Sequence, residues 1–128
     1  MCLLDAVIRW DDGSITCRSS RHRDLDNPLR RADRLAAVCG VEFAAQAMAV
    51  HGALAGSISG RPRAGFLASI RDLVCREARL DLLAGDLVIE VERLMGDDAR
   101  VIYQFALRSG ESEVVSGRAA VVLAAAPA

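Results

Sequence analysis

Two polar side chains interrupt an otherwise apolar stretch of the sequence. Glu42 and Gln46 lie within residues 38–51, where every other residue except the terminal His51 is apolar or Gly. Residues four apart share one face of a helix, one turn from each other. A carboxylate in apolar surroundings is expensive unless it is partnered. Glu42 therefore either pairs with an Arg and anchors a loop, or faces a pocket as an acid/base group or as a group that orients water.

The remaining metal-ligating and nucleophilic side chains point to structural roles. His51 follows Glu42 by nine residues, which places it on the opposite face of the same helix, so we expect a structural histidine. The four cysteines are widely spaced and form no ligand pattern with histidine, so no metal site is predicted. We expect free thiols in a reducing cytoplasm.

The elements that must position these side chains follow a simple order of two strands, one long helix and about four further strands. One apolar helix among antiparallel strands is best buried by a sheet that curls around it. The sequence thus predicts an α+β fold, with a curved antiparallel sheet wrapped around one central helix that is apolar almost all round and therefore buried. The expected segments are strands at 3–10 and 14–19, a polar loop at 20–34, the helix at 35–54 ended by Gly56, Gly60 and Pro62, and strands at 66–74, 87–92, 101–107 and 114–123.

Composition narrows the class of protein. The chain has 128 residues, 52% of them apolar, and a formal net charge of −1, which suits one globular domain over residues 1–125 with a short tail at 126–128. All 16 basic residues are Arg, yet they give no positive excess for binding nucleic acid. The N-terminus lacks the basic leader of a signal peptide, and Glu42, Gln46 and His51 break the longest apolar run, so a cytoplasmic protein without a membrane span is expected.

Several segments resemble one family nearly end to end. Glu42-x-x-Ala45-Gln46 resembles the E-x-x-A-Q motif on the central helix of the hotdog-fold 3-hydroxyacyl-ACP dehydratases. Weaker similarities to that family lie at residues 1–7, at Ala64-Gly65-Phe66 and at Ala84-Gly85-Asp86. Gly40-Val41-Glu42 and Asn27-Pro28-Leu29 look closest to its aryl-polyene-type dehydratase-like members.

The resemblance implies the hotdog fold and a lyase of fatty-acid or polyene-type biosynthesis, which eliminates water from a 3-hydroxyacyl thioester on acyl carrier protein or CoA. It further implies a dimer, with a second copy or with another hotdog subunit, and no cofactor beyond the phosphopantetheine that carries the substrate. Glu42 would be the acid/base group and Gln46 would orient it. Substrate contacts would come from Gly40, Gly65 and Phe66, and carrier-protein contacts from Arg21, Arg23, Arg30 and Arg31.

One position departs from the family pattern. Most members carry a catalytic His about fourteen residues before the Glu, where this chain has Asn27-Pro28. An Asn there can hydrogen-bond a substrate but cannot accept a proton. His22 is the nearest histidine in the same loop.

Two other functions therefore stay open. A hotdog thioesterase could use Glu42 with Asn27 to direct water at the thioester. A non-catalytic acyl-carrier-binding subunit would be the silent half of a heterodimer. One assay separates the three possibilities. An enoyl product indicates the lyase, release of free thiol indicates the thioesterase, and neither product indicates the binding subunit.

Overall fold

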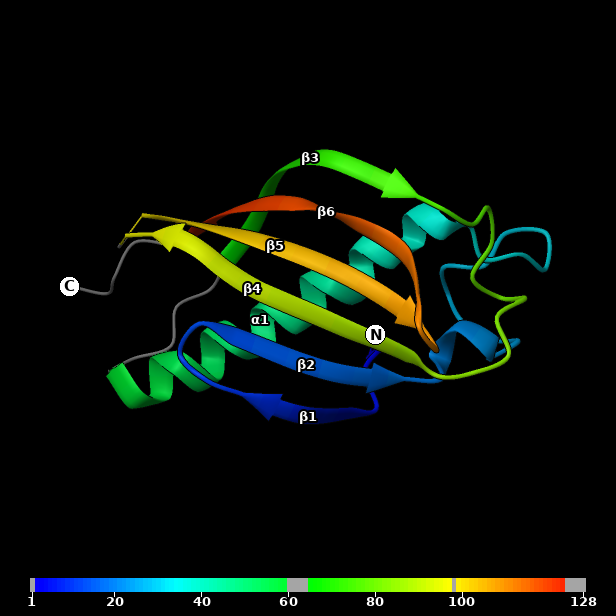
Figure 1. Cartoon of the computed structure of the whole chain (residues 1–128), viewed down its shortest axis with the longest axis horizontal. Coiled ribbons are helices and arrows are strands. Elements are labelled where there is room, and N and C mark those ends of the chain that lie inside the picture. The colour runs from blue at the N-terminus through cyan, green and yellow to red at the C-terminus, as the bar shows by residue number, and fades with distance from the viewer. Residues whose placement is uncertain (1, 60–64, 98, 124–128) are drawn as a thin grey trace.

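The computed structural model describes residues 2–59, 65–97 and 99–123. Some of the expected features lie outside the described residues. They are the helix-ending residues Gly60 and Pro62, the motif residue Ala64 and the tail at 126–128. Figure 1 shows one long helix lying across a curved sheet. The elements are β1 (Ala6–Trp10), β2 (Ser14–Ser19), the 3-10 turns at Arg21–Arg23 and Ala37–Cys39, α1 (Gly40–Ser59), β3 (Gly65–Cys75), β4 (Leu87–Gly96), β5 (Arg100–Ser109) and β6 (Ser112–Leu123).

The six strands form one antiparallel sheet in the order β1-β2-β4-β5-β6-β3. Alternate residues of β4 and β5 face α1, because side chains alternate between the two faces of a strand. The inward set is fully or nearly fully buried and comprises Leu87, Ile89, Val91, Val101, Tyr103, Phe105 and Leu107. A curved antiparallel sheet around one helix is the hotdog arrangement, so the predicted fold is confirmed.

The helix begins five residues later than predicted. Residues 35–37 instead pair with the segment before β4: the Leu80 N–H donates to the Leu35 carbonyl at 2.8 Å, and the Ala37 N–H donates to the Ala78 carbonyl at 3.0 Å. These long-range backbone bonds outweigh local helix propensity. At its other end α1 continues past Gly56 to Ser59.

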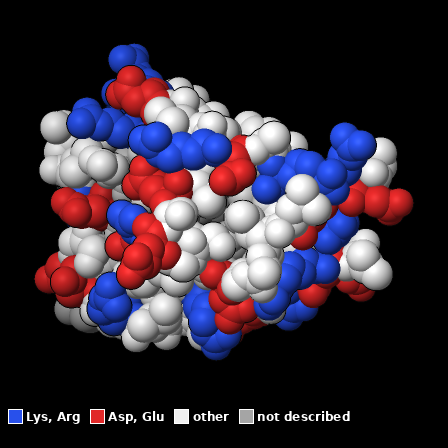
Figure 2. Space-filling model, turned by 45° about the vertical axis from the view of Figure 1, so that its right-hand side comes forward, with Lys and Arg blue, Asp and Glu red and all other residues white. Residues whose placement is uncertain are grey.

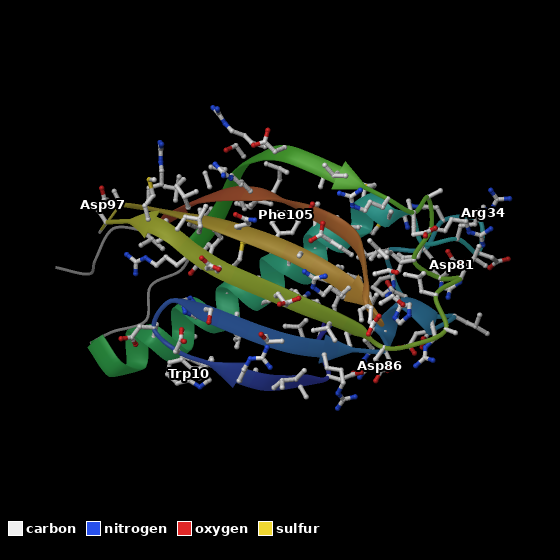
Figure 3. All side chains as sticks on the ribbon, viewed as in Figure 1. Trp10, Arg34, Asp81, Asp86, Asp97 and Phe105 are labelled. Atoms are coloured by element: carbon white, nitrogen blue, oxygen red, sulfur yellow. The ribbon has the colours of Figure 1, made fainter. Side chains whose placement is uncertain are left out.

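A buried carboxylate fastens this junction. Asp81 accepts the Leu35 N–H at 2.9 Å and pairs with Arg79 at 2.6 Å. The Arg79 hydrogen bonds and the Leu35 N–H hold the pKa of Asp81 well below its usual value, against the opposing effect of burial. Figure 3 shows Asp81 and Arg34 at the same end of the molecule, with Asp97 at the other.

The apolar composition of the helix predicted that it is buried all round, and this prediction is wrong. The segment Ala37–Ala55 has a mean hydropathy of 1.3 and is long and apolar enough to cross a membrane. In this fold it packs against β2, β4 and β5, while Glu42, Ala49 and Ala53 remain exposed. The sheet of one chain covers only part of the helix surface, and an apolar strip is left open.

Candidate functional site

Glu42 lies in the first turn of α1 on the uncovered side of the helix. Its carboxylate forms no hydrogen bond or ion pair with any residue that the structure describes. The alternative that Glu42 anchors a loop through an Arg is therefore wrong for the described part of the chain. A solvent-facing carboxylate without a partner is available to act on a bound molecule.

An apolar pocket of about 220 Å³ opens along the same side of the helix. Ala45, Ala49 and Gly52 follow Glu42 by three, seven and ten residues, which keeps them on its face of the helix. Their small side chains leave the space that the pocket occupies. It is lined by Ala45, Met48, Ala49, Gly52 and Ala53 of α1, Gly65 and Leu67 of β3, Val101 and Tyr103 of β5, and Val121 and Leu123 of β6.

Gln46 ties the N-terminal segment to the helix. Its side-chain Oε1 accepts a hydrogen bond of 2.7 Å from the backbone N–H of Leu3, whose side chain is buried. The sequence motif suggested that Gln46 orients Glu42. In the structure, its amide oxygen instead holds the N-terminal segment against α1. That Gln46 also orients Glu42 stays a prediction.

Asn27 is buried and uses its amide within its own loop. Its Nδ2 donates to the Arg21 carbonyl at 2.8 Å, and its Oδ1 accepts the Leu29 N–H at 2.9 Å. Asn27 lines a small hollow of about 190 Å³ together with Cys2, Leu3, Arg21, Asp24, Asp26 and Pro28. The amide therefore shapes the loop, and its contact with a substrate stays a prediction.

Both histidines of the chain are enclosed. His22 is fully buried with its Nε2 bonded to the Leu83 carbonyl at 3.0 Å, and burial, reinforced by Arg23, lowers the pKa of its ring. His51 bonds through Nε2 to the Asp11 carbonyl at 2.9 Å. The expectation of a structural His51 is confirmed, and neither ring contacts Glu42.

Tyr103 is a pocket residue that the sequence analysis missed. Its hydroxyl lies 3.0 Å from Nδ1 of His51, and its ring meets the imidazole edge to face. The Asp11 carbonyl can only accept, so Nε2 of a neutral His51 carries the proton and Tyr103 donates to Nδ1. Burial raises the pKa of Tyr103, against a smaller lowering by Arg93. Tyr103 alternates with more exposed residues of β5 and so faces inward, but nothing in the sequence indicates that it lies beside a pocket.

The glycine and aromatic residues suggested by the resemblance lie in three different surroundings. Gly65 lines the pocket, and a Cβ there would lie 2.8 Å from the Val121 side chain. Phe66, next along β3, is 62% exposed. Gly40 is buried away from the pocket, where a Cβ would lie 3.0 Å from Leu107. Gly40 therefore allows α1 to approach the sheet, and substrate contacts by Gly40 and Phe66 stay predictions.

Two of the four arginines predicted to meet a carrier protein are engaged in ion pairs. Arg21 pairs with Asp5 at 3.1 Å and with Asp24 at 3.2 Å, and Arg23 pairs with Asp86 at 2.9 Å. Figure 2 shows basic and acidic side chains interspersed over the face it presents, rather than one positive patch.

The other two arginines bond to backbone carbonyls of the loop. Arg30 donates to the carbonyls of His22, Asp24 and Asp33, and Arg31 donates to that of Pro28. These bonds hold the loop in shape. In the described ranges, no group of three or more His, Cys, Asp or Glu side chains is placed to hold a metal ion.

Comparison with known proteins agrees with this architecture. The family model described as ApeP-like, ApeP dehydratase, matches residues 1–127. No curated protein sequence matches the chain. The dehydratase heterocomplex ApeI:P from Xenorhabdus doucetiae contains a chain with a TM-score of 0.86 and 20% identity, covering 97% of this chain and 84% of that one.

Thioesterase structures are similar at lower scores. A mutant thioesterase from Pseudomonas aeruginosa has a TM-score of 0.67 and 12% identity, covering 91% of this chain and 78% of its own. A hypothetical thioesterase from Streptococcus pneumoniae, solved with coenzyme A, has a TM-score of 0.69 and 11% identity, covering 96% and 88%. These likenesses show the shared fold, and the family match over residues 1–127 shows that the chain belongs to the ApeP-like dehydratase family.

Proposed function

We propose that this chain is one subunit of a 3-hydroxyacyl thioester dehydratase, in which Glu42 is the acid/base group and a different hotdog chain supplies the histidine. The observation that carries the proposal is the free carboxylate of Glu42 on the helix face that continues into an apolar pocket. The carboxylate would meet the reacting carbons while the acyl tail lies along Ala45 and Ala49.

Dehydration needs two proton transfers. A base removes the proton from the α-carbon, the electron pair of that C–H bond forms the double bond, and the C–O bond at the β-carbon breaks. Glu42 in its protonated form gives its proton to the departing hydroxyl, which leaves as water. The base then holds one proton and Glu42 has lost one, so transfer of that proton back to Glu42 resets the site.

The base has to come from outside this chain. His22 and His51 are the chain's two histidines, and both are fully buried and bonded to backbone carbonyls. A second copy of the same chain would bury its histidines in the same way. A hotdog partner of different sequence, with an accessible histidine, would complete the site. The ApeI:P heterocomplex is a precedent within a similar fold.

The outer edge of β3 offers a surface for that partner. β3 pairs with β6 on one side only, and within the described residues its other edge has no neighbouring strand. Phe66 is 62% exposed and Leu67 is 42% exposed on this edge. Unpaired strands with exposed apolar side chains are open to pairing with another chain. The strip of α1 that carries Glu42 and the pocket beside β3 would then be covered by the partner.

Substrate delivery and compartment follow from the same proposal. The substrate would arrive as a thioester on acyl carrier protein or CoA, with no further cofactor. All four cysteines are free, which fits a cytoplasmic protein.

The test compares the chain alone with the chain co-purified with a histidine-bearing hotdog subunit of the same organism. Each is incubated with a 3-hydroxyacyl thioester and with a saturated acyl thioester, while enoyl product and free thiol are followed. Enoyl formation by the complex, with none by the isolated chain, supports the proposal. Release of thiol from the saturated substrate identifies a thioesterase instead. No product from either preparation, despite a stable complex, identifies a binding subunit.

A further inference from the structure

Three arginines from three neighbouring strands surround a hollow on the outer face of the sheet. Arg71 of β3, Arg100 of β5 and Arg118 of β6 all line this hollow of about 260 Å³. Tyr103 and Ala119 are buried towards α1, so the residues next to them in each strand point the opposite way. The hollow therefore lies on the face of the sheet opposite the helix and the apolar pocket.

Two of these arginines are direct cross-strand partners. Arg71 stands opposite Arg118 in the β3–β6 register, and Gln104 of β5 stands on the other side of Arg118. Like charges directly opposite each other on one face destabilise a sheet. Among the described residues, no Asp or Glu forms an ion pair with Arg71, Arg100 or Arg118.

Arg9, Arg30, Arg31, Arg34 and Arg93 also form no ion pair with a described residue, but the hollow is where three such arginines line one space. Six other arginines are paired. Arg18, Arg21, Arg23, Arg76, Arg79 and Arg108 each have a carboxylate partner. The acidic group that attracts Arg100 is Asp97, whose carboxylate already accepts the backbone N–H groups of Ala99 and Arg100. The positive charge of the hollow is thus not balanced by an ion pair within the described chain.

The floor of the hollow consists of two small side chains, Ser69 and Ala120, and the larger Ile102. Ser69 stands opposite Ala120, and Ala120 stands opposite Ile102, in one row across β3, β6 and β5. The Arg71–Arg118 pair lies on one side of this row and Arg100 on the other. The row leaves room for a compact anion, and the hydroxyl of Ser69 is the polar group on its floor.

We propose that this hollow binds a phosphate group. A phosphate carries close to two negative charges at neutral pH and several acceptor oxygens, and Arg guanidinium groups match those oxygens with paired N–H donors. A single carboxylate would leave most of the charge of three arginines unbalanced. The phosphate could be free or part of a phosphorylated carrier such as CoA, and the site does not depend on the proposed dehydration.

The experiment follows the arginine Nε–H resonances by NMR while the full chain is titrated with inorganic phosphate, with CoA and with pantetheine, which has no phosphate. Phosphate or CoA should shift a common set of signals saturably, and pantetheine should not. Arg71→Gln and Arg118→Gln should each weaken binding by about tenfold or more, the usual loss for a charge-assisted bond. Arg34→Gln, which removes the same charge from the exposed loop, should change the affinity by less than about twofold.

The outcomes separate the sources and decide the proposal. If phosphate and CoA bind with equal affinity, the phosphate group alone accounts for binding. If CoA binds more tightly, the ligand of the hollow is a phosphorylated carrier. Without ligand, Arg118→Gln should raise the melting temperature by relieving the pair of like charges. Absence of saturable binding, equal binding of pantetheine, or an equal loss in Arg34→Gln would overturn the site.

Discussion

Gln46 accepts a hydrogen bond of 2.7 Å from the backbone N–H of Leu3, one helical turn beyond Glu42. The contact fixes the start of the chain against the helix beside the candidate catalytic carboxylate. The same side chain therefore links the fold to the surroundings of the site.

Replacing Gln46 by Ala should destabilise the domain, because the N–H of buried Leu3 loses its acceptor. The free energy of unfolding should fall by about 1–3 kcal/mol, the usual penalty for an unsatisfied buried donor. Urea denaturation followed by circular dichroism measures this change. Gln104→Ala, on the exposed outer face, is the matched control. Equal stability of the Gln46 variant and the wild type would show that the bond to Leu3 contributes nothing.

Tyr103→Phe should also lower stability while leaving the shape of the pocket unchanged. The phenyl ring still lines the pocket wall, but Nδ1 of buried His51 loses the hydroxyl group that donates a hydrogen bond to it. A loss of about 1–3 kcal/mol is expected from thermal or urea unfolding. An unchanged melting temperature would mean that water replaces the hydroxyl without penalty.

Asp81 should make stability depend on pH in the acid range. Its pKa in the folded chain lies below the ordinary value of 3.8 because of Arg79 and the Leu35 N–H. The unfolded chain therefore takes up the proton first, so the stabilisation is complete above about pH 4 and is lost as pH falls towards the folded pKa. Urea unfolding from pH 6 to pH 2 should show a shallower decline for Asp81→Ala than for the wild type. If stability falls with pH equally steeply in the variant and the wild type, Asp81 is not the source of the pH dependence.

Filling the pocket should select against long acyl chains. Ala49→Leu adds a branched side chain to the wall, and each CH2 of substrate kept out of apolar surroundings forfeits about 0.8 kcal/mol. The KM for a long-chain thioester should rise on the order of tenfold, with short chains little affected. Ala78→Leu, at an exposed position away from the pocket, should leave both unchanged. An equal effect on short and long chains would place the acyl tail elsewhere.

Much of the fold could be predicted from the sequence because period-two alternation in β4 and β5 and one apolar helical stretch report directly on burial. The start of α1 could not, since residues 35–37 are held by backbone bonds to a segment more than forty residues away. The exposure of Glu42 was also missed. Apolar composition predicts that a helix is covered, but the sheet of this chain covers only part of α1 and leaves Glu42 exposed.

The candidate site was found by residue type and not by contact. The spacing of Glu42 and Gln46 identified the helix face that carries the exposed carboxylate and the pocket. The hydrogen bonds of Asn27 and Gln46 depend instead on which segments pack against them. No local pattern encodes the closeness of Leu3 to Gln46, or that of Tyr103 to His51, because these pairs are more than forty residues apart.

The most direct test of the account is the turnover of a 3-hydroxyacyl thioester by the complex of this chain with the proposed histidine-bearing hotdog subunit, with Glu42 replaced by Gln. The account predicts an enoyl-forming kcat at least about 100-fold lower, the scale of a lost acid/base group. The complex should stay assembled, and the exposed-turn control Glu111→Gln should keep full activity. Wild-type turnover by the Glu42→Gln complex would contradict the assignment of Glu42 as the acid/base group.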